Sequence, residues 1–464
     1  MPNKSSAQFV TGNLMRHVAV MSLTSSVGIM AIFIVDFVDL LFISMLGNAA
    51  LAAAVGYAGI ILFFTNSINI GLSIAAGTLV AKSLGAEQKS EAREYAISVM
   101  VVGFIFCLFI LAGVFYFLDP ILTLLGAEGE VKTLATSYVS IVLPSMPLAS
   151  IAFIGMAVLR SYGDAKRSMY VTLAGGAVNA MLDPLLIFTL DFGLEGAAMA
   201  SVAARISMMA ITMYLLIKTH NAIARINLAS IISHLKNIIA ILLPAMLANV
   251  ATPIGSAIMM REMAKFGTDA VAGMAIIGRM TPVAFSVVFA LSGSIGPIVG
   301  QNFGAGNMAR VRTAFVDAIK FTFVYIIAVA IILYFTRDYI VALFGATGIA
   351  AELVMLFCGV LALAFFFNGI IFIANACFNN LGRPIYSTYV NWGKNTIGTL
   401  PFILIGASLW GATGILLGQA VGSLVFAAIA LWLSLKVMKQ GGGSQKPSEF
   451  QQHQRLHAVQ NRKH

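Results

Sequence analysis

Apolar residues run in long stretches along this chain, and short polar segments separate them. A helix of about 20 apolar residues spans the hydrocarbon core of a bilayer. The stretches predict twelve transmembrane helices, at 17–46, 51–82, 93–118, 131–154, 165–190, 193–219, 236–266, 270–301, 313–335, 349–376, 387–408 and 411–437. The predicted fold class is therefore an all-α membrane protein.

The polar segments indicate how the chain is divided. Residues 1–13 form an N-terminal cytoplasmic segment, and 438–464, rich in Gly, Gln and Lys, a flexible cytoplasmic tail. Residues 220–235 are amphipathic, which is typical of a connection that lies on the membrane surface. This connection separates an N-lobe, residues 14–219, from a C-lobe, residues 236–437.

The second half of the chain repeats the first with an offset of 219 residues. Asp119 and Asp338 keep this offset, and similar sequences, LTLLGA and VALFGA, follow them. The glycine pairs that keep it are Gly85 and Gly304, Gly126 and Gly345, and Gly163 and Gly382. The repeat predicts two homologous six-helix lobes related by a pseudo-two-fold axis along the membrane normal, with a transport site between them.

Carboxylates interrupt two of the predicted helices. Asp36 and Asp39 share a face of the first helix, and Asn179 and Asp183 share a face of the fifth. An Asp at the centre of a membrane helix costs about 2.5–3.5 kcal/mol on insertion scales, so it usually faces a polar cavity or a partner. These residues are therefore predicted to bind an exchangeable cation.

The repeat acts as an internal control on this prediction, because a residue needed only for architecture should recur in both halves. The aligned pairs are Asp36 and Gly255, Asp39 and Ile258, and Asp183 and Phe402. The C-lobe lacks the carboxylates, so we interpret them as functional and assign ion coupling to the N-lobe. A buried polar cluster that locks helix packing is the alternative.

Other polar residues in the predicted helices are candidates for a substrate cavity. Arg205 has no charged counterpart in the C-lobe; it either pairs with Asp183 or Asp36, or extends its charge to the membrane surface. Asn368 and Asn375 belong to a polar stripe on the tenth helix. A cavity lined by this stripe is the expectation.

Composition and charge narrow the function classes. The chain has 464 residues, of which 59% are hydrophobic and 10% charged, so it is not a soluble globular protein. The net charge of +10 lies mostly in short loops and the tail, which is the positive-inside pattern rather than a nucleic-acid surface. Both termini are predicted to be cytoplasmic.

Enzyme chemistry has little support in the sequence. No HExxH, CxxC or P-loop pattern occurs, and the histidines are not at metal-ligand spacing. The three cysteines lie far apart in apolar stretches, so we expect buried thiols. We expect no cofactor, and an ion gradient of H⁺ or Na⁺ as the energy source.

Several motifs together resemble those of one transporter family. They are Val38-Asp39 followed by Gly47, LRSYGDAKRSMY at 159–170, NAMLDP at 179–184, GLEGAAMAS at 193–201 and GPIVGQNFGAGN at 296–307. The chain resembles the MATE (multidrug and toxic compound extrusion) transporters, DinF-like branch, over residues 14–437. The resemblance implies a V-shaped pair of lobes that export amphipathic, often cationic drugs in exchange for H⁺ or Na⁺.

The resemblance also implies a cation-binding network in the first lobe. The matching positions are Asp39, Asn179 and Asp183, with Tyr138 and Ser201 beside them. Members similar to NorM carry acidic residues in the second lobe too, where this chain has uncharged side chains, so coupling through the first lobe is favoured. Some DinF-like members bend the first helix at a proline, which this helix lacks; serines and a glycine are left to allow a bend.

The predicted function is an antiporter of the bacterial inner membrane, acting as a monomer. Asp39, with Asp183, takes a proton in the outward-facing state, the first helix rearranges, and the N-lobe cavity expels the drug. A lipid-intermediate flippase is the alternative, since Arg205, Arg279 and Lys394 leave a cationic cavity open. A membrane scaffold or an intramembrane enzyme would move no protons when drug is added.

Overall fold

The computed structural model describes residues 7–396 and 398–441, and within them the fold is helical. The first half contains η1 (Gln8–Val10), α1 (Leu14–Met45), α2 (Ala49–Gly85), α3 (Lys89–Leu124), α4 (Gly129–Val142), η2 (Leu143–Ser145), α5 (Met146–Ser161), α6 (Ala165–Pro184), η3 (Leu185–Thr189), α7 (Gly193–Tyr214) and η4 (Leu215–Thr219). The second half contains α8 (Leu228–Ala264), α9 (Thr268–Ala284), α10 (Ser286–Gly304), α11 (Met308–Leu343), α12 (Gly348–Leu356), η5 (Phe357–Leu361), α13 (Ala362–Asn380), α14 (Ile385–Asn395) and α15 (Leu400–Lys439).

These elements form twelve membrane spans among the described residues. Ten stretches are long and apolar enough to cross a membrane, and α9 and α10, bent by 48°, together make an eleventh. One of the ten stretches, Ile385–Lys439, supplies two spans because α15 reverses at Trp410 and Gly411, where the backbone is not helical. The two arms pack backbone to backbone: a Cβ on Gly406 would lie 2.1 Å from the Gly414 carbonyl oxygen.

The twelve predicted helices are confirmed, with ends shifted by a few residues. One expectation is corrected. The connection between the lobes is irregular only over residues 220–227, because α8 begins at Leu228, eight residues before the predicted start. The Asn227 side chain accepts a hydrogen bond from the Ala229 N–H and caps this helix, which explains the early start.

The first helix, α1, is continuous from Leu14 to Met45. The predicted tail lies for the most part outside the described residues.

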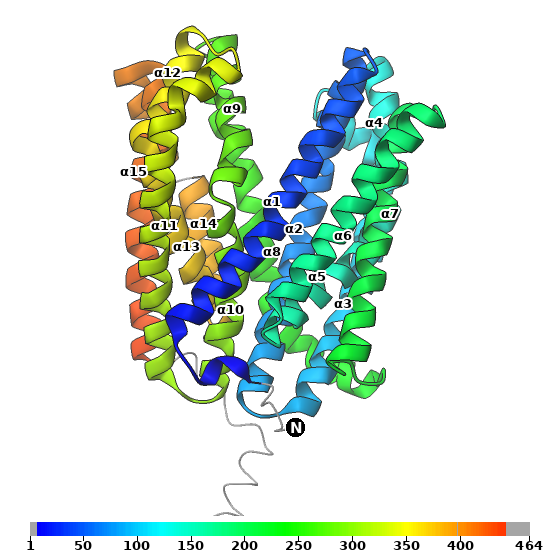
Figure 1. The fold of residues 1–464 in the computed structure, drawn as a ribbon, viewed down its shortest axis with the longest axis vertical. Helices are drawn as coiled ribbons and strands as arrows, with labels where there is room; N and C mark the ends of the chain where they lie inside the picture. The colour runs from blue at the N-terminus through cyan, green and yellow to red at the C-terminus, as the bar shows by residue number, and fades with distance from the viewer. Residues whose placement is uncertain (1–6, 397, 442–464) are drawn as a thin grey trace, which may run out of the picture.

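The spans form two lobes that splay apart at one end and meet at the other, where the described chain also begins and ends (Figure 1). At the closed end α2 of the N-lobe packs directly on α10 of the C-lobe. A Cβ added to Gly85 would lie 2.0 Å from the Gln301 carbonyl oxygen, and one added to Gly304 would lie 2.1 Å from the Lys82 carbonyl oxygen. Only glycine permits this approach, so the two repeat-related glycines close this end.

The backbone reproduces the sequence repeat in detail. Repeat-related glycines adopt the left-handed conformation at corresponding turns, with φ of 90° and 59° at Gly126 and Gly345, and 79° and 77° at Gly163 and Gly382. L side chains are strained at such φ values. The paired turns agree with two homologous halves.

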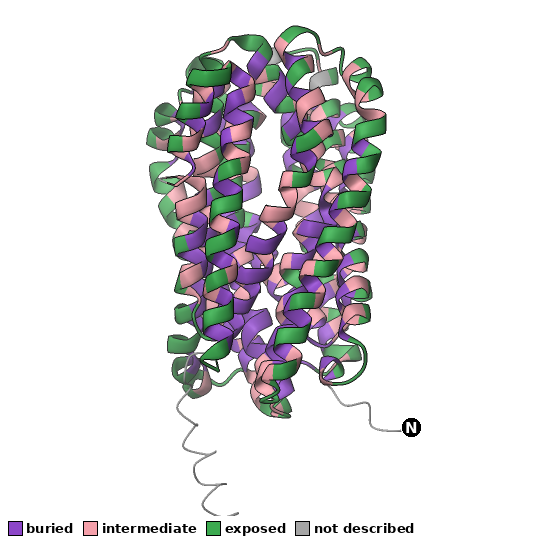
Figure 2. Cartoon of the chain, turned by 90° about the vertical axis from the view of Figure 1, so that its left-hand side faces the viewer, coloured by how far each residue is buried: buried purple, intermediate pink, exposed green. Residues whose placement is uncertain are grey.

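Buried residues are concentrated where helices face one another, and exposed residues cover the outer faces (Figure 2). Many of the exposed side chains are large and apolar, such as Phe109, Tyr116 and Phe335, which are 73%, 80% and 79% exposed. An apolar surface of this extent is unusual for a protein surrounded by water but suits contact with lipid.

The N-terminal segment joins both lobes at the closed end. The Phe9 N–H donates to Gln301 Oε1 (2.8 Å), and Gln301 Nε2 in turn donates to the Ser161 carbonyl of the N-lobe (2.8 Å). The Arg310 guanidinium donates to the carbonyls of Phe9, Thr11 and Gly12 at 3.0, 3.2 and 3.1 Å. The segment and Gln301 therefore tie α10 and α11 to the end of α5.

Replacing Arg310 by Gln should lower the free energy of unfolding of the purified protein by about 1.5–3 kcal/mol, the usual range for hydrogen bonds to a charged group. The variant loses three carbonyl contacts of the N-terminal segment. Thermal unfolding in detergent measures the effect. Arg312→Gln is the matched control, because Arg312 donates to one carbonyl among the described residues, that of Met438, at 3.1 Å. Equal losses in the two variants would contradict the role given to Arg310.

Candidate functional site

Small residues let α1 pack closely on α6, and this contact positions the carboxylates. A Cβ on Gly28 would lie 2.5 Å from Thr172 Oγ1, and one on Gly176 would lie 3.1 Å from Val35 Cγ2. With the two helices this close, Asp39 of α1 lies opposite Asn179 and Asp183 of α6. Residues 140 or more positions apart in sequence thus meet inside the N-lobe.

Asn179 lies against both carboxyl groups in a largely buried environment. Asp183 is fully buried, Asn179 is 4% exposed and Asp39 is partly exposed. Asn179 Nδ2 lies 3.4 Å from Asp183 Oδ1, and in the other orientation of the amide it donates to the Asp39 oxygens at 3.0 and 3.2 Å. The two carboxyl groups are therefore close enough to interact electrostatically. Ionised carboxylates are acceptors only, so a shared proton or a bound cation stabilises two of them side by side.

Two further predicted residues join this group. Tyr138 on α4 is 8% exposed, is a neighbour of Ser201 on α7, and is close enough to both carboxyls to interact with them electrostatically. Five of the six predicted coupling residues therefore gather in the N-lobe. We refer to Asp39, Tyr138, Asn179, Asp183 and Ser201 as the N-lobe cluster.

Asp36, the sixth, faces a different space. It is exposed and lines a cleft of about 740 Å³ between the lobes. Phe33 and Phe37 of α1 form one wall, and residues of α9 and α11 form the other. Arg279 of α9 lies over the Phe37 ring, 5.8 Å from its centroid, and so contacts the N-lobe across the cleft. Asp36 thus lies in the cleft wall, and its part in ion coupling with Asp39 stays a prediction.

Arg205 does not form either of the ion pairs expected for it. Its Nη1 donates to the Val142 carbonyl (3.3 Å) and to Ser145 Oγ (3.0 Å). The break between α4 and α5 at residues 143–145 leaves that carbonyl without a regular helical partner. Arg205 thus stabilises the broken span, while its charge still acts on Asp36 at longer range.

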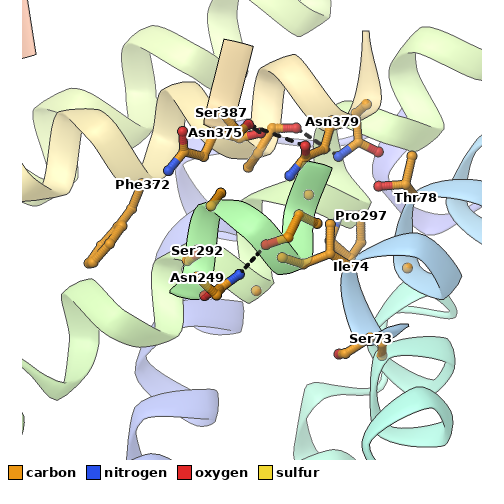
Figure 3. A pocket seen from close by; sticks show the side chains of 18 of the residues that line it. Ser73, Ile74, Thr78, Asn249, Ser292, Pro297, Phe372, Asn375, Asn379 and Ser387 are labelled. Carbon is orange, nitrogen blue, oxygen red and sulfur yellow. Dashed lines mark hydrogen bonds between the residues drawn. The ribbon is translucent and has the colours of Figure 1, made fainter. Parts of the chain in front are cut away.

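The C-lobe asparagines lie apart from the large cleft. Asn368 accepts a hydrogen bond from Lys394 Nζ. Asn375 lines a smaller polar cavity between the lobes, together with Ser292 and Asn379 (Figure 3). The side chains of the expected polar stripe on the tenth span therefore lie in two different environments. Its residues are not among those that line the 740 Å³ cleft.

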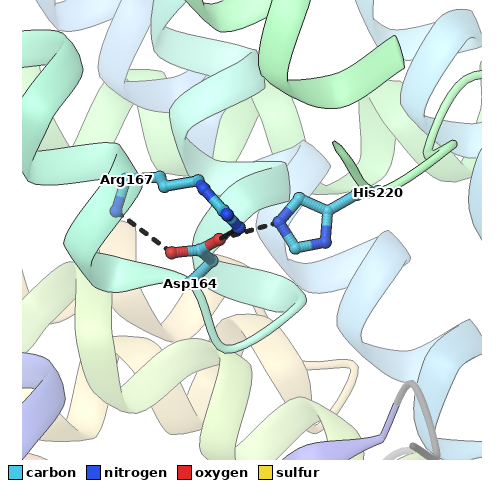
Figure 4. Close-up of polar contacts among 3 residues, drawn as sticks. All are labelled: Asp164, Arg167 and His220. Carbon is cyan, nitrogen blue, oxygen red and sulfur yellow. Dashed lines mark hydrogen bonds and ion pairs between the residues drawn. The ribbon is translucent and has the colours of Figure 1, made fainter. Parts of the chain in front are cut away.

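Sequence reasoning missed an ionic contact at the closed end (Figure 4). Asp164, which caps α6, accepts from the Arg167 N–H at 3.0 Å, from Arg167 Nη1 at 2.7 Å and from His220 Nε2 at 2.8 Å. Burial alone would raise the pKa of Asp164, but these donors outweigh it and lower the pKa to about 2. The Asp followed three positions later by a basic residue was the available signal for the cap; the contact from His220 had none.

Asp164→Asn should destabilise the protein by about 1.5–3 kcal/mol at neutral pH, because a charge-assisted acceptor is lost. A carboxyl whose pKa is lowered by folding stabilises the fold above its ordinary pKa of 3.8 and loses that contribution as the pH falls through about 2. The difference between variant and native protein should therefore not shrink between pH 8 and pH 5. Thermal unfolding across this range tests it, and a difference that disappears by pH 5 would contradict the assignment.

Comparisons with known proteins agree with this architecture. The MatE family model matches residues 24–185 and 244–402. The FAD transporter of Shewanella oneidensis is 28% identical and covers 90% of this chain and 93% of its own length. The multidrug export protein MepA of Staphylococcus aureus is 24% identical, covering 88% and 91%.

Solved structures show the same fold. A mutant of the Vibrio cholerae MATE transporter VcmN superposes with a TM-score of 0.87 at 24% identity, covering 92% of this chain and 97% of that one. The family match covers both lobes, in agreement with the resemblance seen in the sequence, although the DinF-like branch stays a prediction. The chain belongs to the MATE family of multidrug efflux proteins, whose members are membrane transporters and not enzymes.

Proposed function

We propose that this transporter exports amphipathic compounds in exchange for H⁺, and that the N-lobe cluster carries the proton. The proximity of Asp39 and Asp183, with Asn179 against both, supports this most strongly. Two negative charges in a largely buried site repel each other by several kcal/mol, whereas a proton bound to one of them removes the repulsion. We take H⁺ as the coupling ion, because a carboxyl group carries a proton without needing further ligands.

We infer that the closed end faces the cytoplasm of a bacterial inner membrane. The turns at this end carry basic residues, among them Lys89, Arg93, Lys166 and Arg310, as the positive-inside rule requires. On this assignment both termini are cytoplasmic and the structure is open to the outside. A proton that enters from outside neutralises the Asp pair, α1 shifts against α6, and the drug leaves. Opening at the cytoplasmic end then releases the proton.

The cleft supports an amphipathic aromatic cargo. Its walls are apolar apart from Asp36 on α1 and Arg279 on α9. A flat aromatic compound can pack against Phe33 and Phe37 on one wall, and Asp36 attracts a cationic group. A lipid-linked pyrophosphate would need a clear excess of positive charge, so the flippase alternative is less favoured by this one-to-one balance.

A second candidate cargo is a flavin dinucleotide, favoured by the FAD transporter of Shewanella oneidensis among the relatives. Arg279 forms no salt bridge among the described residues and could attract a phosphate group. Everted vesicles distinguish the candidates. Ethidium or FAD is added to vesicles that hold a proton gradient, and a fluorescent probe reports proton release. Ethidium should trigger proton release without Na⁺. Proton release with FAD alone would select the second candidate. Proton release with neither compound would reject the proposal.

A further inference from the structure

A second polar cavity, of about 100 Å³, lies on the pseudo-two-fold axis between the lobes. Repeat-related residues from both halves line it: Ser73 with Ser292, Gly77 with Gly296, Ala157 with Ala376, and Arg160 with Asn379. Each member of a pair is 219 positions from the other. Figure 3 shows side chains of both lobes converging on this space, which we name the axial cavity.

Arg160 is the positively charged residue that lines the axial cavity. Its Nη1 donates to Ser168 Oγ at 3.0 Å and its Nη2 to Ser73 Oγ at 3.4 Å. Its Nε is buried without a hydrogen-bond partner, and no salt bridge of the described residues includes this side chain. Placing an uncompensated guanidinium in the membrane-spanning region costs several kcal/mol. A structural role alone does not account for a charge here.

The C-lobe shows what an uncharged version of this position looks like. Asn379 takes the place of Arg160, and the hydroxyl of Ser387, the counterpart of Ser168, donates to Asn379 Oδ1 at 3.2 Å. The helix contact is thus maintained without a charge. Asparagine satisfies the architecture, so the arginine in the N-lobe has a further function.

The remaining polar groups define the chemistry of a ligand. The guanidinium presents planar donors that match an oxyanion. The Asn375 and Asn380 side-chain oxygens are buried and unpartnered, and they can accept hydrogen bonds. Hydrogen phosphate and singly protonated phosphate esters have both charged acceptor oxygens and an O–H donor. A cavity of this size has room for one such group.

We propose that the axial cavity is a phosphate-binding site with Arg160 as its principal ligand. Because residues of both lobes line the axial cavity, a bound phosphate group contacts both lobes only while the closed end of the molecule stays closed. The ligand therefore favours the closed-end conformation through its differential affinity for the two states. The phosphate group is either free inorganic phosphate or the ester end of a cargo molecule. This site is separate from the N-lobe cluster and does not depend on proton coupling.

Thermal unfolding of the full-length protein in detergent tests the site, with inorganic phosphate, phenyl phosphate or chloride added at equal ionic strength. Phosphate should raise Tm saturably, by about 5 °C near 100 times Kd, and chloride should not. A rise with phenyl phosphate alone would identify the ester end of a cargo as the ligand. No saturable rise with either phosphate compound would overturn the proposal.

Two variants assign the effect to Arg160. Arg160→Gln should abolish the response, whereas Arg312→Gln, which changes a cation outside the axial cavity, should keep it. Gly293→Asp is a second test of the site, and it remains informative even where the Arg160→Gln variant does not fold. A Cβ at Gly293 lies 3.6 Å from Arg160 Nε, so the new carboxylate should occupy the cavity and also abolish the response. Gly293→Ala, with the same Cβ and no charge, should respond like the native protein. A native-like response in Gly293→Asp would contradict the site.

Discussion

Asp39→Asn should abolish drug tolerance in cells that produce normal amounts of the transporter. The amide cannot exchange a proton with Asp183, so the contact between the two side chains no longer depends on the proton gradient. Coupling free energies between two ligands typically correspond to factors of about 5–150, and the drug gradient that the cell maintains should fall by a factor in this range. Growth in drug, with membrane abundance measured in parallel, checks the prediction.

Asp36→Asn is the matched control on the same helix. Asp36 lines the cleft, so this variant should change which cations are exported and leave proton release intact. Normal drug tolerance in Asp39→Asn would contradict the role given to the N-lobe cluster. Loss of proton release in both variants would remove the distinction between coupling and substrate binding.

A single methyl group at the closed end should force the lobes apart. In Gly85→Ala or Gly304→Ala the new Cβ would overlap a carbonyl oxygen of the opposite lobe, at 2.0 or 2.1 Å. The carbonyl belongs to the helix backbone and the backbone also fixes the position of the Cβ, so no side-chain rotation relieves the clash. We expect either variant to lose the conformation described above and to transport poorly, because the cycle needs this end to close.

Spin labels at Ser90→Cys and Ala309→Cys measure the effect, since both positions are exposed at the closed end and are related by the repeat. The distance between them should be short in the native protein and longer in either glycine variant. Gly56→Ala is the control: it lies on α2 as well, and its Cβ would meet no atom within 4 Å. An unchanged distance in Gly85→Ala would mean that the contact does not close this end.

Much of the architecture was predictable because membrane helices are specified by local hydropathy. Repeats and turn glycines added the two-lobe organisation, since the same left-handed turns recur at Gly126 and Gly345. The N-lobe cluster was predictable for a related reason. Carboxylates are costly in a bilayer, so Asp39 and Asp183 stand out against their surroundings even before their neighbours are known.

The sequence did not indicate the features that depend on which faces of distant helices pack together. Asp36 is three residues from Asp39, which suggested one site, but the packing of α1 on α6 turns Asp36 to the cleft. Arg205 could have reached a carboxylate, but it donates instead to the Val142 carbonyl and to Ser145 at the broken span. Arg160 lies between two predicted helices, in a predicted loop. Only the packing of α10 against it encloses the side chain in the folded protein. Each outcome was decided by a partner more than fifty residues away.

Proton movement in proteoliposomes that contain only the purified protein tests the central claim most directly. An amphipathic cation is added on one side of the membrane in Na⁺-free buffer, and a pH-sensitive dye on the other side reports proton exchange. The account predicts that the native protein exchanges drug for protons without Na⁺ and that Asp39→Asn and Asp183→Asn do not. Drug transport that requires Na⁺, or proton exchange that persists in both variants, would contradict it.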